Sequence, residues 1–311
     1  MRARAGRRAN LDARSAREEP LLPDPTTEDM SDSIDVILAQ TAPRLRATRD
    51  NAGDLLAAAE AARGAGPSLL VAPELALSGY DLRDAAAEAA LTPEHVAALL
   101  APAGAAIAGF PERANDGALY NSAAHVDGGR VVAVHRKVYL PTYGMFDEAR
   151  VFAPGDDVAA HDWSGWRIGM LVCEDYWHPG LVYALAAQRI ELLVVLAAAP
   201  GRGVLEAEDG ARFASWQTWR RMAEVYARVL GIYVALVNRT GVEDGVTFAG
   251  GSFVMSPDGR MVASAPEGTP GTTVARLERA ELTRARTPAW HGRDDRPLVV
   301  ARALMRAEGI G

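Results

Sequence analysis

Short apolar runs typical of β-strands alternate with helical stretches along most of this 311-residue chain, and no other feature limits the fold as strongly. Strand-like runs include IDVILAQ (34–40), SLLVAPE (68–74) and ELLVVLAAA (191–199), each with few polar interruptions. Residues 48–63 and 211–230 show helical spacing instead. Strands that alternate with helices, with hairpins between some of them, predict a layered α/β fold built on mixed sheets.

The remaining segments fit the same pattern. Gly128-Gly129 separates two strand-like runs and predicts a hairpin, while Pro257-Asp258-Gly259 predicts a turn. Further strands are expected at 105–110, 119–127, 130–137, 166–175, 232–240, 250–264 and 271–277, and further helices at 84–100, broken by Pro93, and at 181–190. We expect residues 31–311 to form a single domain, because no repeat and no linker interrupts them. Its last 30 residues are expected to be a tail that packs on another surface.

Residues 1–30 differ from the rest in composition. Residues 1–17 carry six arginines against one acidic residue, Asp12, and a Pro-rich run follows. The apolar core of a secretory signal is missing from this segment. We expect residues 1–30 to be a disordered tail, with Met30 as an alternative start of translation.

Charge and composition exclude several classes of protein. A formal net charge of −7 argues against a nucleic-acid partner, and no run reaches the roughly 18–20 apolar residues of a membrane helix. A single cysteine allows no internal disulfide and fits a reducing, cytoplasmic location. The six histidines show no metal-ligand spacing, and no cofactor is implied.

Two residue types occur only once. Lys137 is the only lysine among 33 basic residues, and Cys173 is the only cysteine. Codon bias from a GC-rich genome explains the excess of arginine. Under that bias, a retained lysine indicates a position where arginine, with its planar and permanently charged guanidinium, cannot replace it.

Three segments end in a polar or reactive residue where an apolar run stops, namely Glu74, Lys137 and Cys173. In α/β folds, chemistry gathers at the carboxyl ends of strands. Taken singly, each residue has a structural explanation: a buried inert thiol, a helix-capping glutamate and a solvated lysine. Together they form a nucleophile, a proton carrier and a cation.

The surrounding motifs give this combination a clear resemblance. The segments APELALSGY (Glu74), HRKVYLPTYGMFDEARVFAPGD (Lys137) and GMLVCEDYWHPG (Cys173) resemble the nitrilase superfamily of carbon–nitrogen hydrolases, over about residues 34–290. Those enzymes have a Glu–Lys–Cys triad in this order. The resemblance implies a nitrilase-type αββα sandwich with mixed sheets, two of which pack into a four-layer dimer. A homodimer or higher homo-oligomer is therefore expected.

The chemistry expected of these groups is amide cleavage through a thioester. Cys173 attacks the carbonyl carbon as a thiolate, with its pKa lowered by the nearby cation. Glu74 carries the proton, and Lys137 stabilises the oxyanion together with the backbone N–H of Glu174. The resemblance adds Glu148 as a second glutamate that orients these groups; the alternative is a surface carboxylate paired with Arg150.

Other residues are expected around the substrate or in structural roles. Tyr80, Tyr143 and Phe146 are expected to line the pocket that holds the substrate, with core packing as the alternative. Asp175 is expected to cap the helix that begins near it.

The wording LPTYGMFDE and CEDYW is similar to the glutaminase domain of glutamine-dependent NAD synthetases, here without a synthetase domain. LAAAP (196–200) stands where that domain has a polar, glutamine-contacting segment, which favours a less polar acyl group. We therefore expect a hydrolase of small carboxamides or N-carbamoyl compounds. The alternatives are a nitrilase, a glutamine-hydrolysing subunit that donates ammonia to a synthetase partner, and a non-catalytic scaffold of the same fold.

Overall fold

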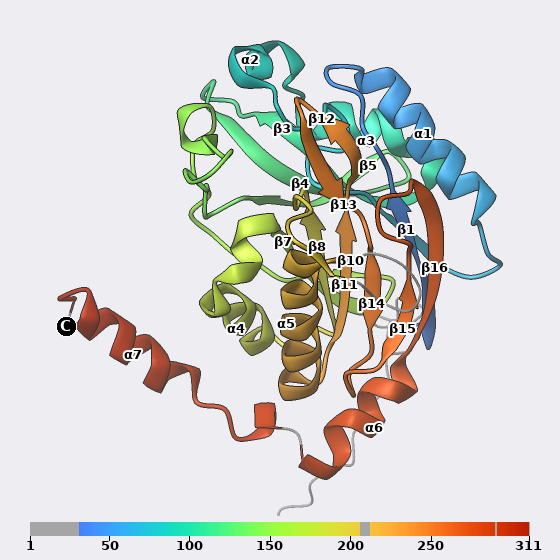
Figure 1. Cartoon of the computed structure of the whole chain (residues 1–311). Coiled ribbons are helices and arrows are strands. Elements are labelled where there is room, and N and C mark those ends of the chain that lie inside the picture. Colours follow the sequence, from blue (N-terminus) through green and yellow to red (C-terminus); the bar gives the residue numbers. More distant parts are fainter. Residues whose placement is uncertain (1–30, 206–211, 290, 311) are drawn as a thin grey trace, which may run out of the picture.

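Two six-stranded sheets form the centre of the molecule in the computed structural model (Figure 1). The structure describes residues 31–205, 212–289 and 291–310, so the tail expected at residues 1–30 lies outside the described residues. None of the helices in these described ranges is long and apolar enough to cross a membrane.

The first sheet is mixed. Its central strands β1, β2 and β3 are parallel, while β16, β4 and β5 pair antiparallel with their neighbours. In spatial order its strands are β16 (Gly271–Glu278), β1 (Ser33–Gln40), β2 (Ser68–Val71), β3 (Ala105–Arg113), β4 (Leu119–Asp127) and β5 (Arg130–Arg136).

The second sheet is also mixed and has a parallel centre formed by β7, β8 and β11. Its spatial order is β15 (Met261–Ser264), β14 (Phe253–Met255), β11 (Tyr233–Asn238), β8 (Leu192–Ala197), β7 (Trp166–Val172) and β6 (His161–Trp163). Two short two-stranded ribbons lie outside the main sheets, formed by β9 (Val204–Leu205) with β10 (Arg212–Phe213) and by β12 (Thr240–Glu243) with β13 (Val246–Ala249).

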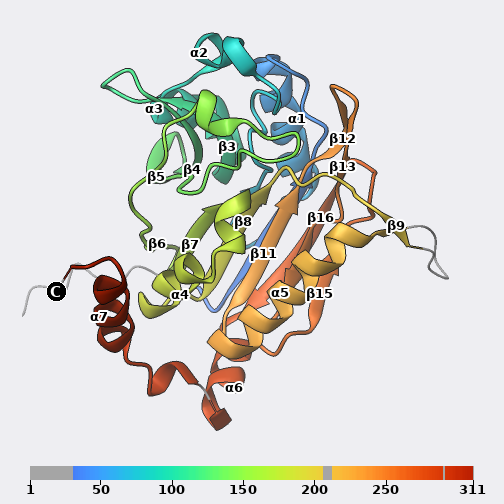
Figure 2. The same cartoon turned by 60° about the vertical axis from the view of Figure 1, so that its left-hand side comes forward.

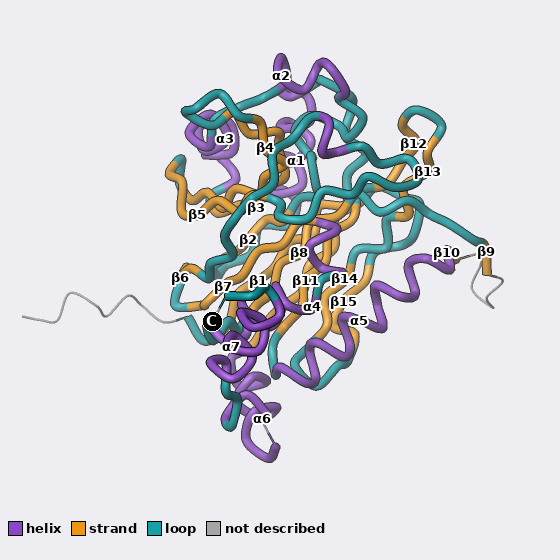
Figure 3. The backbone as a smooth tube through the Cα atoms, turned by 90° about the vertical axis from the view of Figure 1, so that its left-hand side faces the viewer, coloured by secondary structure: helices purple, strands orange, loops and turns teal. Residues whose placement is uncertain are grey.

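Helices cover the outer faces of both sheets (Figures 2 and 3). The helices are α1 (Thr48–Ala61), α2 (Ala86–Ala89), α3 (Pro93–Leu100), α4 (Pro179–Ala187), α5 (Ala214–Leu230), α6 (Arg279–Ala289) and α7 (Pro297–Ala307). Strand β1 shows how the layers arise, because its side chains alternate between faces. Val36 and Leu38 join the core shared with the second sheet, whereas Ile37 and Ala39 pack with α1 and α3. The predicted αββα layering with mixed sheets is therefore confirmed.

Most expected elements are present, with shifted ends. Strand β2 stops at Val71, so Glu74 lies in the turn that follows rather than on the strand. Pro93 begins α3 instead of interrupting one long helix, as expected of a residue without an N–H at a first helical position. Strand β14 starts only at Phe253, because the preceding residues belong to the β12–β13 hairpin and its exit.

The C-terminal segment contains two helices that the sequence interpretation described only as a tail. Leu282 of α6 is buried in the main core, and Arg286 donates hydrogen bonds to the carbonyl oxygens of Gly231 and Ile190. Helix α7 lies outside the layered body beyond α4, and its side chains are exposed (Figure 1).

Candidate active site

Glu74 is fully buried in the tight turn after β2. Gly109 on β3 allows the backbone of this turn to lie close against the strand, and its N–H donates to the Pro73 carbonyl oxygen at 3.2 Å. A Cβ atom at Gly109 would lie 2.4 Å from the Leu75 nitrogen and 2.7 Å from the Glu74 Cα. Leu75 itself has a φ of +48°, which costs energy for a residue with a side chain. The turn that carries the carboxylate is therefore strained and closely packed.

Lys137 follows β5 and is also fully buried. Its Nζ donates to Glu74 Oε1 and to Glu148 Oε1, each at 2.7 Å. Burial alone would lower the pKa of this lysine, but Glu148 and Glu74 outweigh it and raise the pKa well above the usual value. The buried lysine is therefore a cation held between two carboxylates.

Glu148 begins a short 3₁₀ turn (Glu148–Arg150) and is buried. It accepts a short hydrogen bond from the Tyr80 hydroxyl as well as the bond from Lys137. Burial is the main cause that raises the pKa of Glu148, and Lys137 opposes it. The alternative of a surface pair with Arg150 is wrong, because Arg150 pairs with Asp84 at 3.2 Å instead.

Cys173 lies where β7 gives way to a short 3₁₀ helix, Cys173–Trp177. Its φ of +48° is in the left-handed region, which is uncommon for residues other than glycine and recurs at functional sites. Burial raises the pKa of the Cys173 thiol well above its usual range, and Glu74 adds to this, whereas Lys137 and the Ala198 N–H lower it. Lys137 therefore lowers the pKa of the thiol, as expected. Burial and Glu74 outweigh it, so the pKa of Cys173 is raised overall and not lowered.

Two further groups complete the surroundings of the Glu74 carboxylate, and the sequence interpretation missed both. Asn121, fully buried on β4, donates from Nδ2 to Glu74 Oε1 at 2.8 Å and approaches Glu148 Oε2 at 3.4 Å. The backbone N–H of Ala198 donates to Glu74 Oε2 at 2.9 Å. A lone asparagine inside the apolar strand LYNSAAHVD was the available signal for Asn121. No sequence signal marks a backbone N–H.

The four residues expected to contact substrate form one connected series. Tyr80 packs edge-on against Phe146 with ring centroids 6.0 Å apart, and Phe146 packs edge-on against Tyr143 at 5.6 Å. The Tyr143 hydroxyl donates to Glu174 Oε2 at 2.8 Å. Because Tyr80 also bonds Glu148, the series runs from the buried carboxylates to Tyr143, a residue that is 55% exposed.

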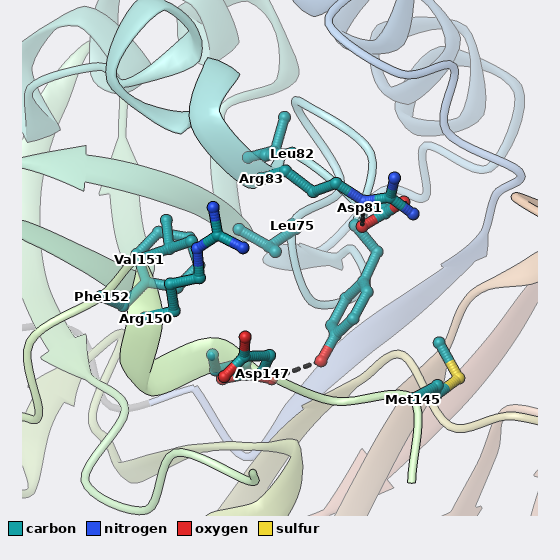
Figure 4. Close-up of a pocket in the computed structure, with 11 residues that line it drawn as sticks. Leu75, Asp81, Leu82, Arg83, Met145, Asp147, Arg150, Val151 and Phe152 are labelled. Carbon is teal, nitrogen blue, oxygen red and sulfur yellow. Dashed lines mark hydrogen bonds and ion pairs between the residues drawn. The ribbon is translucent and has the colours of Figure 1, made fainter. Parts of the chain in front are cut away.

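A cavity of about 170 Å³ lies beside Tyr80 and Glu148 (Figure 4). Arg150, Val151 and Phe152 lie on one side of it, and Met145 lies on the other. Its lining mixes apolar and charged side chains: Leu75, Tyr80, Asp81, Leu82, Arg83, Met145, Asp147, Glu148, Arg150, Val151 and Phe152. Within the described ranges, no group of three or more His, Cys, Asp or Glu side chains could hold a metal ion.

The family model for carbon-nitrogen hydrolases matches residues 36–287. This chain therefore belongs to the carbon-nitrogen hydrolase family, and it is an enzyme of that class. The glutamine-dependent NAD(+) synthetase of Rhodobacter capsulatus is 32% identical over 84% of this chain. The predicted resemblance to the glutaminase domain of such synthetases is thus confirmed.

The chain spans about half the length of the curated relatives it matches, 46% of the Rhodobacter protein. Two solved structures match over nearly their whole length. The amidase of Nesterenkonia AN1, from the nitrilase superfamily, is 25% identical with a TM-score of 0.70, covering 86% of this chain and 96% of that one. The carbon-nitrogen hydrolase of Helicobacter pylori G27 has a TM-score of 0.76 at 23% identity over 88% and 98%, which supports the nitrilase fold alone.

Proposed function

We propose that this chain is a thiol hydrolase that cleaves the C–N bond of a small carboxamide, or of an N-carbamoyl compound, to an acid and ammonia. The observation that carries the proposal is the placement of the single lysine. Lys137 lies fully buried between Glu74 and Glu148 and acts electrostatically on the Cys173 thiol. A buried cation between two carboxylates beside a thiol supplies the groups that acyl transfer needs.

The raised pKa of the thiol defines the first step. Cys173 holds its proton at rest, and Glu74 accepts this proton as the sulfur attacks the carbonyl carbon. Lys137 and the Glu174 N–H stabilise the oxyanion. Because negative charge develops on the carbonyl oxygen only as the sulfur attacks, this interaction lowers the barrier more than it strengthens substrate binding. The C–N bond then breaks, Glu74 gives its proton to the departing ammonia, and a thioester on Cys173 remains.

The second half of the cycle uses the same groups. Glu74 removes a proton from water, whose oxygen attacks the thioester carbonyl. The C–S bond breaks, the acid leaves, and Glu74 passes the proton taken from water to the Cys173 thiolate. The amidase of Nesterenkonia sp. AN1 supports a nucleophilic role for the cysteine, since the acetamide moiety of fluoroacetamide adds covalently at the active-site cysteine of a glutamate-to-glutamine mutant of that enzyme.

A second candidate function rests on the curated relatives. Because the chain is similar to glutamine-dependent NAD(+) synthetases, the acyl substrate could be glutamine, with the ammonia passed to a separate synthetase. Alanines occupy 197–199 at the end of β8 and directly after it, and this apolar segment favours a less polar amide. We further propose that the chain acts as a homodimer in a four-layer sandwich, and a monomeric mass by light scattering at micromolar concentration would contradict this.

The test is ammonia release from a panel of aliphatic and aromatic carboxamides, glutamine, N-carbamoyl amino acids and nitriles. We expect release from at least one amide or carbamoyl compound, abolished in Cys173→Ala. Ser122→Ala is the matched control, because it removes one atom from another fully buried side chain, which contacts Glu112 outside the site. Ammonia release from nitriles alone would make the enzyme a nitrilase. The absence of ammonia release from every compound of the panel would overturn the proposal.

A further inference from the structure

Lys137 and Cys173 are carried by strand ends of different sheets. Lys137 follows β5 at the edge of the first sheet, and Cys173 follows β7 in the second. Among the described residues no ladder hydrogen bonds join β5 to β7, so backbone pairing within a sheet does not fix the separation of the two residues. A group that bonds to both strand ends would fix it.

Asp175 reaches the first of these strand ends. Its carboxylate is fully buried, and Oδ1 accepts from the backbone N–H groups of Val138 at 3.0 Å and Tyr139 at 2.9 Å. These two residues directly follow Lys137. Hydrogen bonds to an ionised carboxylate are stronger than those between neutral groups, so the backbone after the lysine is firmly held.

The other carboxylate oxygen reaches the second strand end. Asp175 Oδ2 accepts from the backbone N–H of Val172, the residue before Cys173, at 3.2 Å. It also lies 2.8 Å from His135 Nε2 on β5, in a buried contact. The expected helix-capping role therefore describes only the Val172 bond, since the other three partners come from β5 and the segment after it.

We propose that Asp175 is a positioning residue, which holds the strand end that carries Lys137 against the turn that carries Cys173. The inference rests on the proposed thiol hydrolase function. Asp175 acts through the backbone and touches no reacting atom. Misplacement of a catalytic group by about 1 Å can cost about a hundredfold in rate, so a clamp between two sheets matters to catalysis.

Asp175→Asn is the direct test. The amide retains one oxygen for the N–H groups of Val138 and Tyr139, but its NH₂ cannot accept from the N–H of Val172. We expect kcat to fall about tenfold to a hundredfold, because the lysine and thiol lose their fixed separation, with KM changed by less than about threefold.

The rate of Cys173 alkylation by iodoacetamide near neutral pH gives a second readout, which needs no substrate. Because the chain has one cysteine, the reaction reports on this thiol alone. We expect the rate to change at least about threefold in Asp175→Asn, as the thiol leaves its place beside Lys137. If wild type releases no ammonia while this change is seen, the hydrolase proposal fails and the positioning role stands.

Glu112→Gln is the matched control. Glu112 is another buried carboxylate, which accepts from Ser122 and Arg136 within the first sheet and, among the described residues, bonds to none in the second. It should leave kcat and alkylation at wild-type values. An equal loss in Glu112→Gln, or wild-type kcat and alkylation in a folded Asp175→Asn, would overturn the proposal.

His135→Ala keeps the proposal testable should Asp175→Asn fail to fold. It removes one partner of Oδ2 and leaves the three backbone bonds in place. We expect a loss of a few-fold in kcat with KM unchanged, and His135→Gln, which can donate to the carboxylate, should restore part of it. Wild-type kcat in a folded His135→Ala together with an unfolded Asp175→Asn would assign Asp175 a purely structural role.

Discussion

Replacing Lys137 by methionine should destabilise the protein as well as inactivate it. The substitution keeps an unbranched side chain, one atom shorter, but leaves the Glu74 and Glu148 carboxylates buried without their shared cation. Loss of one partner from a buried ion pair costs about 3–5 kcal/mol, which for a domain of this size lowers Tm by roughly 6–10 °C. Loss of the oxyanion stabiliser should lower kcat by about a hundredfold to a thousandfold.

The destabilisation should depend on pH with a defined sign. Burial already raises the pKa of Glu148, and Lys137 lowers it, so removing the lysine raises this pKa further. A carboxyl whose folded pKa exceeds its unfolded pKa favours the folded state at low pH and loses that contribution as pH rises. The deficit of Lys137→Met relative to wild type should therefore grow between about pH 5 and pH 8.

Urea unfolding of both proteins at several pH values measures this deficit. Arg150→Met is the control, because it removes a cation from an exposed pair with Asp84 and should cost less than about 1 kcal/mol. A deficit in Lys137→Met that matches the control, or one that does not change with pH, would refute the picture of a buried cation between two carboxylates.

Two other substitutions test separate parts of the structure. Burial lowers the pKa of His125 to about 3 and that of His161 to about 4. The unfolded chain therefore binds protons more readily than the folded one as pH falls below about 6.5, and the free energy of unfolding decreases. At pH 5 the decrease is about 2 kcal/mol per histidine. His125→Phe should reduce this loss in urea unfolding, and an unchanged pH slope would contradict the assignment. Gly109→Ala should displace Glu74 and lower kcat at least about tenfold, because the new Cβ meets backbone atoms; wild-type kcat would show that the turn yields freely.

The sequence predicted the layers because strand and helix periodicities are local properties. Strand β1 shows this, since its alternating side chains divide between the two cores as a two-faced strand requires. The hairpin of β12 and β13 was missed although Asp244-Gly245 is a turn signal, because its strands are short and weakly apolar. The short strands β6, β9 and β10 are too brief to give a periodic signal.

The site residues that lie in sequence motifs could be predicted, whereas those brought in from distant segments of the chain could not. Glu74, Lys137 and Glu148 were named from the sequence, and the structure brings them into direct contact. The contacts of Asn121 with this group depend on the pairing of β3 with β4, which no local pattern reveals. The net pKa direction of Cys173 was also out of reach, because it follows from the depth of burial.

The most direct test of the proposed mechanism is to trap the acyl-enzyme. Wild-type protein is mixed with the best amide of the panel, quenched in acid during turnover and analysed by intact and peptide mass. We predict a mass increase equal to the acyl group on the peptide that contains Cys173, removed by hydroxylamine and absent in Cys173→Ala. Ammonia release without an adduct, or with an adduct on another residue, would contradict the thiol mechanism.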